Sequence, residues 1–182
     1  GLVGSEMCIR DRYTEGAFRD WAYELVKNKY HSKWKFYKLN LIEKCSLNDI
    51  FETYKPKIVI NLAAQAGVRY SLKDPHSYVK TNLVGFGNIL ELVKSFSVGN
   101  FIYASSSSVY GGNTNMPFNE SQSVDHPVSF YAATKKSNEM IAHSYSHLFN
   151  MSVTCIVCPL LVQCVDCSFH VPAVCVMCVL IF

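Results

Sequence analysis

Apolar residues recur along the chain with two different spacings, and the two spacings alternate from one segment to the next. A repeat every three or four residues predicts an amphipathic helix, and a short continuous apolar run predicts a buried strand. The first pattern predicts helices over residues 17–26, 46–55, 75–95 and 131–147. The second predicts strands over residues 36–41, 57–62, 101–105 and 153–157. This alternation is typical of the α/β class with a parallel sheet.

Short sequence signals predict where several of these helices begin. Ser46-Leu-Asn-Asp49 has the form of a capping box, and Pro56 ends the helix that follows. Asp74-Pro75 supplies an N-cap followed by proline at the first helical position. Ser129 is placed to cap the helix that carries Tyr131.

Composition and charge fit an ordinary globular domain. Of the 182 residues, 49% are hydrophobic and 17% charged, which allows a sizeable core, and the net charge is only +3. Basic residues do not alternate with aromatic ones in any run, so nucleic-acid binding has no support. The chain does not open with a signal-peptide pattern.

Cysteines are concentrated near the C-terminal end. Six of the eight form three Cys-x-x-Cys pairs: Cys155 with Cys158, Cys164 with Cys167, and Cys175 with Cys178. A zinc site would use two such pairs, but the gaps between them are short and lack polar loop residues. A membrane helix needs about 20 apolar residues, and Asp166, His170 and Pro172 interrupt every such window. We favour a third interpretation, in which this tail is out-of-frame or aberrant sequence, and we expect no metal site.

Tyr131 and Lys135 carry the clearest chemical signal. Four residues apart on a helix, their side chains lie on one face, one turn apart. A phenol ordinarily titrates near pH ~10, and a neighbouring ammonium favours the phenolate, which makes the phenol a better base at neutral pH. The pair follows a run of hydroxyl residues, Ser105 to Ser108, at the end of a predicted strand. Such a set can take a proton from a secondary alcohol while a cofactor takes the hydride.

Three stretches together resemble the extended short-chain dehydrogenase/reductases, in the NAD-dependent epimerase/dehydratase family. They are Asn61-Leu-Ala-Ala-Gln-Ala-Gly-Val-Arg-Tyr-Ser71, Ser105-Ser-Ser-Ser-Val-Tyr-Gly-Gly-Asn113 and Val124-Asp-His-Pro-Val-Ser-Phe-Tyr-Ala-Ala-Thr-Lys-Lys136. Within that family the likeness is greatest to the enzymes that epimerise UDP-glucuronate at C4. The resemblance covers about residues 36–151, roughly two thirds of the chain.

The resemblance implies a partial Rossmann-like, doubly wound parallel sheet of strand order 3-2-1-4-5-6. Residues 36–41 would be its third strand and residues 57–62 its fourth, so we expect the first two strands to be missing and the neighbouring edges to be unpaired. We expect three segments: a non-native leader over residues 1–12, a partial NAD-binding domain over 13–154, and the Cys-rich tail over 155–182.

The resemblance also assigns site residues. Tyr131 would be the general base, Lys135 its activator and a ligand of the nicotinamide ribose, and Ser106 the catalytic hydroxyl. Further cofactor contacts would come from Asn40, Leu41, Leu62, Ala63, Ala64, Gln65 and Asn82. Substrate contacts would come from Arg69, Ser106 and Ser107. Asn40 stands where the family usually has aspartate.

The implied activity is that of a nucleotide-sugar 4-epimerase, converting UDP-glucuronate to UDP-galacturonate with bound NAD. Related 4,6-dehydratases carry Asp-Glu where this chain has Ser107 and Ser108, and a related decarboxylase carries glutamate at the place of Ser108. Both differences favour the epimerase. The alternatives are another enzyme of the family, or a truncated product without activity, which we expect for this polypeptide by itself.

By analogy, a homodimer would form through helices 75–95 and 131–147. The compartment stays open: relatives occur as cytoplasmic proteins, which we favour here, and with an N-terminal membrane anchor.

Overall fold

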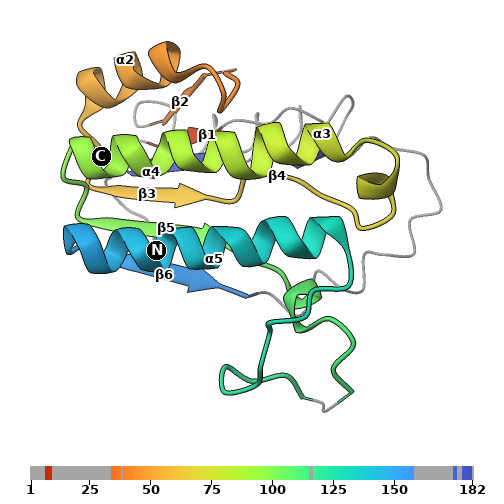
Figure 1. Cartoon of the computed structure of the whole chain (residues 1–182). Coiled ribbons are helices and arrows are strands. Elements are labelled where there is room, and N and C mark those ends of the chain that lie inside the picture. Colours follow the sequence, from red (N-terminus) through yellow and green to blue (C-terminus); the bar gives the residue numbers. More distant parts are fainter. Residues whose placement is uncertain are drawn as a thin grey trace.

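The structure is a computed structural model that describes residues 7–9, 34–37, 39–114, 117–157, 174–175 and 178–181. Strands and helices alternate in it (Figure 1). The strands are β1 (Met7–Ile9), β2 (Trp34–Phe36), β3 (Ile58–Asn61), β4 (Ala64–Gln65), β5 (Asn100–Ala104), β6 (Val153–Ile156), β7 (Val174–Cys175) and β8 (Cys178–Ile181). The α-helices are α2 (Lys44–Tyr54), α3 (Pro75–Tyr78), α4 (Phe86–Ser95) and α5 (Phe130–Phe149). A π-helical segment, Val79–Gly85, joins α3 to α4, and two 3-10 turns span Tyr70–Leu72 and Ser107–Tyr110.

Six of the described strands form one sheet in the order β2-β1-β8-β3-β5-β6. The pairs β1–β2, β3–β5 and β5–β6 are parallel, whereas β8 is antiparallel to both of its neighbours. The partial Rossmann-like sheet is thereby confirmed. The expectation of an unpaired edge on β3 was wrong, because β8 pairs with β3 and β1 lies between β8 and β2. An apolar strand edge is a ready template, and the apolar segment Cys178–Ile181 supplies backbone groups that pair with it.

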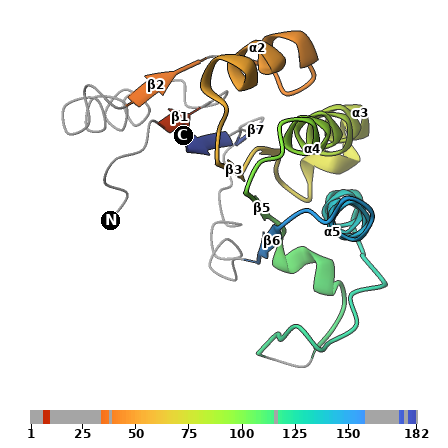
Figure 2. The same cartoon turned by 90° about the vertical axis from the view of Figure 1, so that its left-hand side faces the viewer.

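Helices α3, α4 and α5 lie on the same side of the sheet, and α2 lies next to α4 on the side away from α5 (Figure 2). The core between them is built from the inward faces of α2 and α4 and from β3 and β5. Its most buried members are Phe51, Val59, Ile89, Leu90 and Phe101, each completely shielded from solvent. Every second residue of β5 is buried, as expected for a strand that has one face against helices.

Two predicted helix starts are confirmed and one is wrong. The Asp74 side chain accepts a bond from the Ser77 amide at 3.3 Å, and Ser129 accepts one from the Ala132 amide at 3.1 Å. Helix α2, however, begins at Lys44, two residues before the proposed cap Ser46. The Leu47 amide bonds the Glu43 carbonyl at 3.2 Å, so the main chain closes the first turn without a hydroxyl.

Strand boundaries also differ from expectation in one place. The strand expected over residues 36–41 is observed as Trp34–Phe36, and Leu39 and Asn40 lie outside any strand. The helix expected over residues 17–26 lies outside the described residues, as does most of the Cys-rich tail.

None of the helices that the structure describes has the length and apolar content needed to cross a bilayer. Among the described residues, His, Cys, Asp and Glu do not gather into any group of three or more that could hold a metal ion.

Candidate active site

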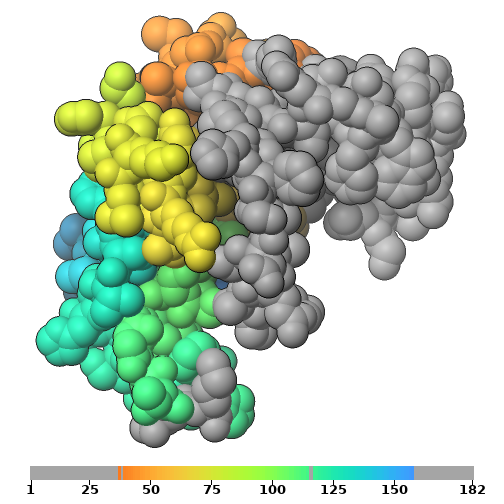
Figure 3. All heavy atoms as spheres, turned by 90° about the vertical axis from the view of Figure 1, so that its right-hand side faces the viewer, coloured from red at the N-terminus to blue at the C-terminus, as the bar shows by residue number. Residues whose placement is uncertain are grey.

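Two of the predicted catalytic residues, Ser106 and Lys135, lie at the carboxyl end of β5, and Tyr131 lies about one helical turn before Lys135 on α5. In open α/β sheets, ligands bind outside this edge of the strands. Figure 3 views the molecule from that side, where the segment after β3, the loop after β5 and the start of α5 lie next to one another. Lys135 anchors α5 there, because its Nζ donates a hydrogen bond of 2.9 Å to the carbonyl of Ala104, the last residue of β5.

Tyr131 and Lys135 occupy the first two turns of α5. The Ser129 cap fixes the start of the helix, so Tyr131 sits on an ordered first turn rather than a frayed end. Lys135 is only 3% exposed, whereas Tyr131 is half-buried at the surface of the site. A buried ammonium is stable only when paired or hydrogen-bonded, and the Ala104 carbonyl contributes one such bond.

The serine run after β5 divides into hydroxyls with different environments. Ser105 is buried and donates to the Glu139 carboxylate of α5. Ser106 is half-buried and caps the 3-10 turn Ser107–Tyr110, its Oγ accepting from the Ser108 amide at 3.2 Å. The Ser105 hydroxyl is thus bonded to α5, whereas the Ser106 hydroxyl donates to Ser108 Oγ at 3.2 Å within the serine run.

Asn82 joins three parts of the site. Its Oδ1 accepts from the Gln65 amide at 2.7 Å, while its Nδ2 donates to the Gln65 carbonyl at 3.1 Å and to Thr134 Oγ1 at 3.0 Å. It lies in the π-helical segment Val79–Gly85, and such bulges are frequent at functional sites. The buried Asn82 amide therefore forms hydrogen bonds through both its oxygen and its nitrogen. It links β4 to Thr134 of α5, one residue before Lys135.

The small residues after β3 form a closely packed backbone segment. Ala63 and Ala64 are 6% and 5% exposed, and Leu62 is half-buried. The Ala63 amide donates to Asn61 Oδ1 at 3.0 Å. Gln65 is buried on the same segment, with both of its main-chain groups bonded to Asn82.

Leu41 packs against the helical stretch that contains Gly85 and Asn88. It is 2% exposed, its carbonyl accepts from Asn88 Nδ2 at 2.9 Å, and it packs on Gly85. A Cβ at Gly85 would lie 2.8 Å from the Leu41 Cβ, so only glycine fits there. Neighbouring Asn40 is half-buried, and its carbonyl accepts from the Glu43 amide at 2.8 Å.

The two remaining predicted substrate residues differ in burial and in position. Ser107 is buried, 7% exposed, directly after Ser106. Arg69 is exposed, directly before the 3-10 turn Tyr70–Leu72.

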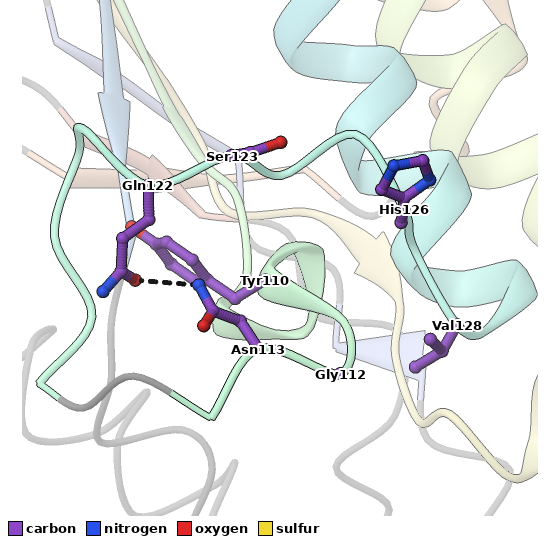
Figure 4. Close-up of a pocket in the computed structure, with 7 residues that line it drawn as sticks. All are labelled: Tyr110, Gly112, Asn113, Gln122, Ser123, His126 and Val128. Carbon is purple, nitrogen blue, oxygen red and sulfur yellow. Dashed lines mark hydrogen bonds between the residues drawn. The ribbon is translucent and has the colours of Figure 1, made fainter.

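A shallow hollow of about 500 Å³ lies in the loop between Tyr110 and α5. Its seven lining residues are Tyr110, Gly112, Asn113, Gln122, Ser123, His126 and Val128 (Figure 4). Asn113 Nδ2 donates to Gln122 Oε1 at 3.3 Å across it. Gly111 shapes one wall, since its φ is +60° and a Cβ there would come within 2.3 Å of the His126 carbonyl.

Sequence reasoning missed Tyr78, whose ring contacts that of Tyr131. Tyr78 is completely buried, and its ring meets that of Tyr131 edge-on, with centroids 6.1 Å apart. Burial, more than the nearby charges, raises the pKa of Tyr78 to about 12. Tyr78 therefore remains a hydroxyl donor at neutral pH and is not a candidate base. Its only sequence signal was apolar spacing, which does not tell a core tyrosine from a site tyrosine.

Proteins of similar sequence cover most of this chain. Protein CapI of Staphylococcus aureus is 49% identical over 146 residues, covering 80% of this chain and 42% of that protein. The UDP-glucuronate 4-epimerase of Thermodesulfobacterium geofontis is 43% identical over 132 residues, covering 72% of this chain and 41% of that protein.

Among solved structures, the UDP-glucuronic acid 4-epimerase of Bacillus cereus, in complex with UDP-glucuronic acid and NAD, superimposes with a TM-score of 0.67 at 26% identity. It covers 80% of this chain, and the chain spans 46% of it. This chain thus spans less than half the length of each of these three proteins.

The family model described as GDP-mannose 4,6 dehydratase matches residues 4–159, which is most of the chain. Together with the sheet, the Tyr131–Lys135 pair and these relatives, the match shows that the chain belongs to this NAD-dependent epimerase/dehydratase family.

Proposed function

We propose that this chain carries the cofactor-binding and proton-transfer part of a nucleotide-sugar 4-epimerase that converts UDP-glucuronate to UDP-galacturonate. The proposal is supported by the position of Tyr131 and Lys135 on the first two turns of the capped helix α5, with Lys135 bonded to the last residue of β5 and Ser106 two residues after that strand. The likeness to UDP-glucuronate 4-epimerases supports the choice of sugar.

The residues at this edge fit the nicotinamide half of NAD. Leu62, Ala63 and Ala64 offer backbone without large polar side chains, and Gln65 and Asn82 hold that backbone in place. Lys135 and Tyr131 would meet the ribose, and Asn40 and Leu41 the adenine side. When bound, NAD supplies the acceptor that takes the hydride from C4 of the sugar and returns it. The sequence has no G-x-x-G-x-x-G turn, so we assign no residues to the pyrophosphate.

In the proposed reaction Tyr131 takes the proton of the sugar 4-hydroxyl, and Ser106 hydrogen-bonds the same oxygen. The Lys135 ammonium stabilises the negative charge that forms on the phenol oxygen. When the hydride returns to the opposite face of C4, Tyr131 gives the proton back, so the reaction is redox-neutral. Arg69 and Ser107 are proposed to contact the sugar.

The serine run argues against a dehydratase. Elimination of water needs an acid and a base near C5 and C6, and the positions that supply them in 4,6-dehydratases hold Ser107 and Ser108 here. Ser107 is buried, so a carboxylate at that place would have been costly unless paired. Hydroxyls at both places support the epimerase.

We also propose that the protein forms a homodimer through the helical face. Helices α4 and α5 lie side by side on one side of the sheet (Figure 1). Val84, in the π-helical segment before α4, and Met140 of α5 are 50% and 62% exposed.

An assay of the purified chain with UDP-glucuronate and NAD tests the function, with UDP-galacturonate separated by chromatography. We expect conversion by a longer protein that contains this chain, and we expect that conversion to disappear in its Tyr131→Phe variant. A catalytically inactive product is the alternative, and NAD binding without conversion would favour it. Failure of both this chain and a longer protein containing it to convert the sugar would refute the proposal.

A further inference from the structure

Tyr78 ends helix α3 and is surrounded by the segments that form the candidate site. Its ring contacts three aromatic rings: Tyr70 with centroids 6.3 Å apart, Phe130 at 6.5 Å and Tyr131 at 6.1 Å. Two of these neighbours, Phe130 and Tyr131, are the first two residues of α5. A completely buried tyrosine thus connects the start of α5 to the chain that follows β4.

The Tyr78 hydroxyl holds the turn after β4. It donates to the Ala66 carbonyl at 2.7 Å and to the Gly67 carbonyl, and the Gln65 side chain bonds it as well. Gly67 has a φ of +95°, a conformation that is costly for any other residue. Since Asn82 holds both main-chain groups of Gln65, two helix residues fix the whole turn from Gln65 to Gly67.

The Tyr78 ring restricts the ring of Tyr131. The two planes meet at 76°, the edge-to-face arrangement that aromatic pairs favour. A half-buried tyrosine on the first turn of a helix could otherwise populate more than one side-chain rotamer. Burial is the main cause of the raised pKa of Tyr78, and a negative charge on Tyr131 raises that pKa further. Tyr78 therefore stays protonated when Tyr131 ionises.

We propose that Tyr78 is a positioning residue for Tyr131, an inference that rests on the proposed function. Its ring holds the Tyr131 side chain in one rotamer facing the substrate, and its hydroxyl independently holds the Gln65–Gly67 turn beside it. Proton transfer requires the donor and acceptor atoms to lie within hydrogen-bond distance. A Tyr131 ring displaced by about 1 Å can therefore lower the rate by about a hundredfold.

NMR of the whole chain with ring-labelled tyrosine tests the proposal without any need for activity. Comparison with the Tyr131→Phe variant assigns the Tyr131 ring signals. In Tyr78→Leu we expect those signals to shift and broaden, because the neighbouring ring is gone. In Tyr78→Phe they should keep the wild-type position, while the amide signals of Gly67 and Val68 move because the carbonyl bonds are lost.

Either of two results would overturn the proposal: Tyr131 signals unchanged in Tyr78→Leu, or Tyr131 signals disturbed in Tyr78→Phe. If Tyr78→Leu does not fold, the Tyr78→Phe spectrum decides alone. If this chain and a longer protein containing it both fail to convert UDP-glucuronate, while the chain shows the expected NMR changes, the proposed function is refuted and the positioning role stands.

Kinetics add a readout that general loss of stability would not give. With an active wild type, we expect Tyr78→Leu to lower kcat by about tenfold or more with KM within about threefold, and Tyr78→Phe to restore kcat. Tyr145→Leu is the matched control, since Tyr145 is a partly buried α5 tyrosine whose ring packs on Phe149, 5.2 Å away. Equal loss of kcat in Tyr78→Leu and Tyr145→Leu would also overturn the proposal.

Discussion

The two halves of helix α5 are built for different purposes. The first half buries polar side chains, among them Thr134, Lys135 and Asn138, each no more than 3% exposed. The second half leaves apolar groups such as Leu148 and Phe149 in solvent, 69% and 47% exposed. Burial of polar groups costs free energy and burial of apolar groups is favourable, so selection for stability alone would not bury polar side chains in the first half of α5.

The bonds that hold the two halves differ in the same sense. The first half is tied to the sheet by Lys135 and to β4 through Thr134 and Asn82. The second half is tied to α4 at its surface, where Tyr145 donates to Glu91 and the Lys94 ammonium lies 4.8 Å from the Phe149 ring centroid. The helix thus offers matched residues, one in the site and one outside it, for separating catalysis from stability.

The largest contrast is expected between the two tyrosines of α5. Tyr131→Phe removes the proposed base and should lower kcat by about 10²–10⁴-fold, the usual contribution of general acid–base catalysis. Tyr145→Phe removes only the bond to Glu91 and should keep kcat within about twofold, since a surface hydrogen bond contributes little to catalysis elsewhere. Parallel assays of the two variants check this, and equal activities would remove Tyr131 from the mechanism.

The adjacent lysines give the next contrast. Lys135→Met keeps the length of the side chain but removes the ammonium bonded to Ala104, and we expect roughly a hundredfold loss of activity. Lys136→Met removes a partly exposed partner of Glu139, 3.5 Å away, and should cost no more than about threefold. Steady-state kinetics with a thermal melt of each variant measure both effects. A Lys135→Met variant with wild-type kcat would contradict the assigned role.

Substitutions of two asparagines in the neighbouring helical stretch should differ in their effect on stability. Asn82→Ala removes three buried hydrogen bonds, two to the main chain of Gln65 and one to Thr134, and should lower the free energy of unfolding by roughly 3 kcal/mol. Asn88→Ala loses one partly buried bond to Leu41 and should cost about 1 kcal/mol. Urea denaturation of both variants provides the comparison, and similar midpoints would show that the Asn82 network contributes little.

The smallest effect is expected from acid acting on Glu91 of α4, the residue that bonds the second half of α5. Hydrogen bonds from Lys94 and then Tyr145 lower the pKa of Glu91 below its ordinary 4.5. The ionised carboxylate therefore stabilises the fold above pH 4.5, and this contribution is lost as the pH falls through the lowered pKa. Because Glu91 is 36% exposed, we expect less than about 0.5 kcal/mol. Urea titrations of the wild type and Glu91→Gln at pH 6 and pH 3 measure it, and a difference above 1 kcal/mol would contradict surface screening.

Local signals in the sequence predicted the elements best where one residue type has a specific task. Asp74 and Ser129 cap their helices as predicted, because a side-chain oxygen one residue before a helix satisfies amides that otherwise lack partners. The start of α2 was predicted less well, since the Glu43 carbonyl closes the first turn there and the main chain carries no residue-specific signal.

The candidate site was predictable in its chemistry but not in its supports. Spacing placed Tyr131 and Lys135 on one face of a helix, and the structure has both on α5. Tyr78 and the π-helical segment were not foreseen, because the apolar repeat over residues 75–95 fits a continuous α-helix equally well. The pairing of β8 with β3 depends on tertiary contacts between distant segments, which periodicity does not report.

The π-helical segment Val79–Gly85 determines how the residues before it are rotated about the helix axis relative to the residues after it. An α-helix advances about 100° per residue, so deletion of one residue at the exposed Val84 would regularise the coil and swing Tyr78 and Asn82 together away from Tyr131 and Thr134. Such a deletion would leave the apolar stripe of α4 intact while it uncouples the supports from the chemistry. Length within this one turn is therefore under tighter constraint than the identity of its solvent-facing side chains.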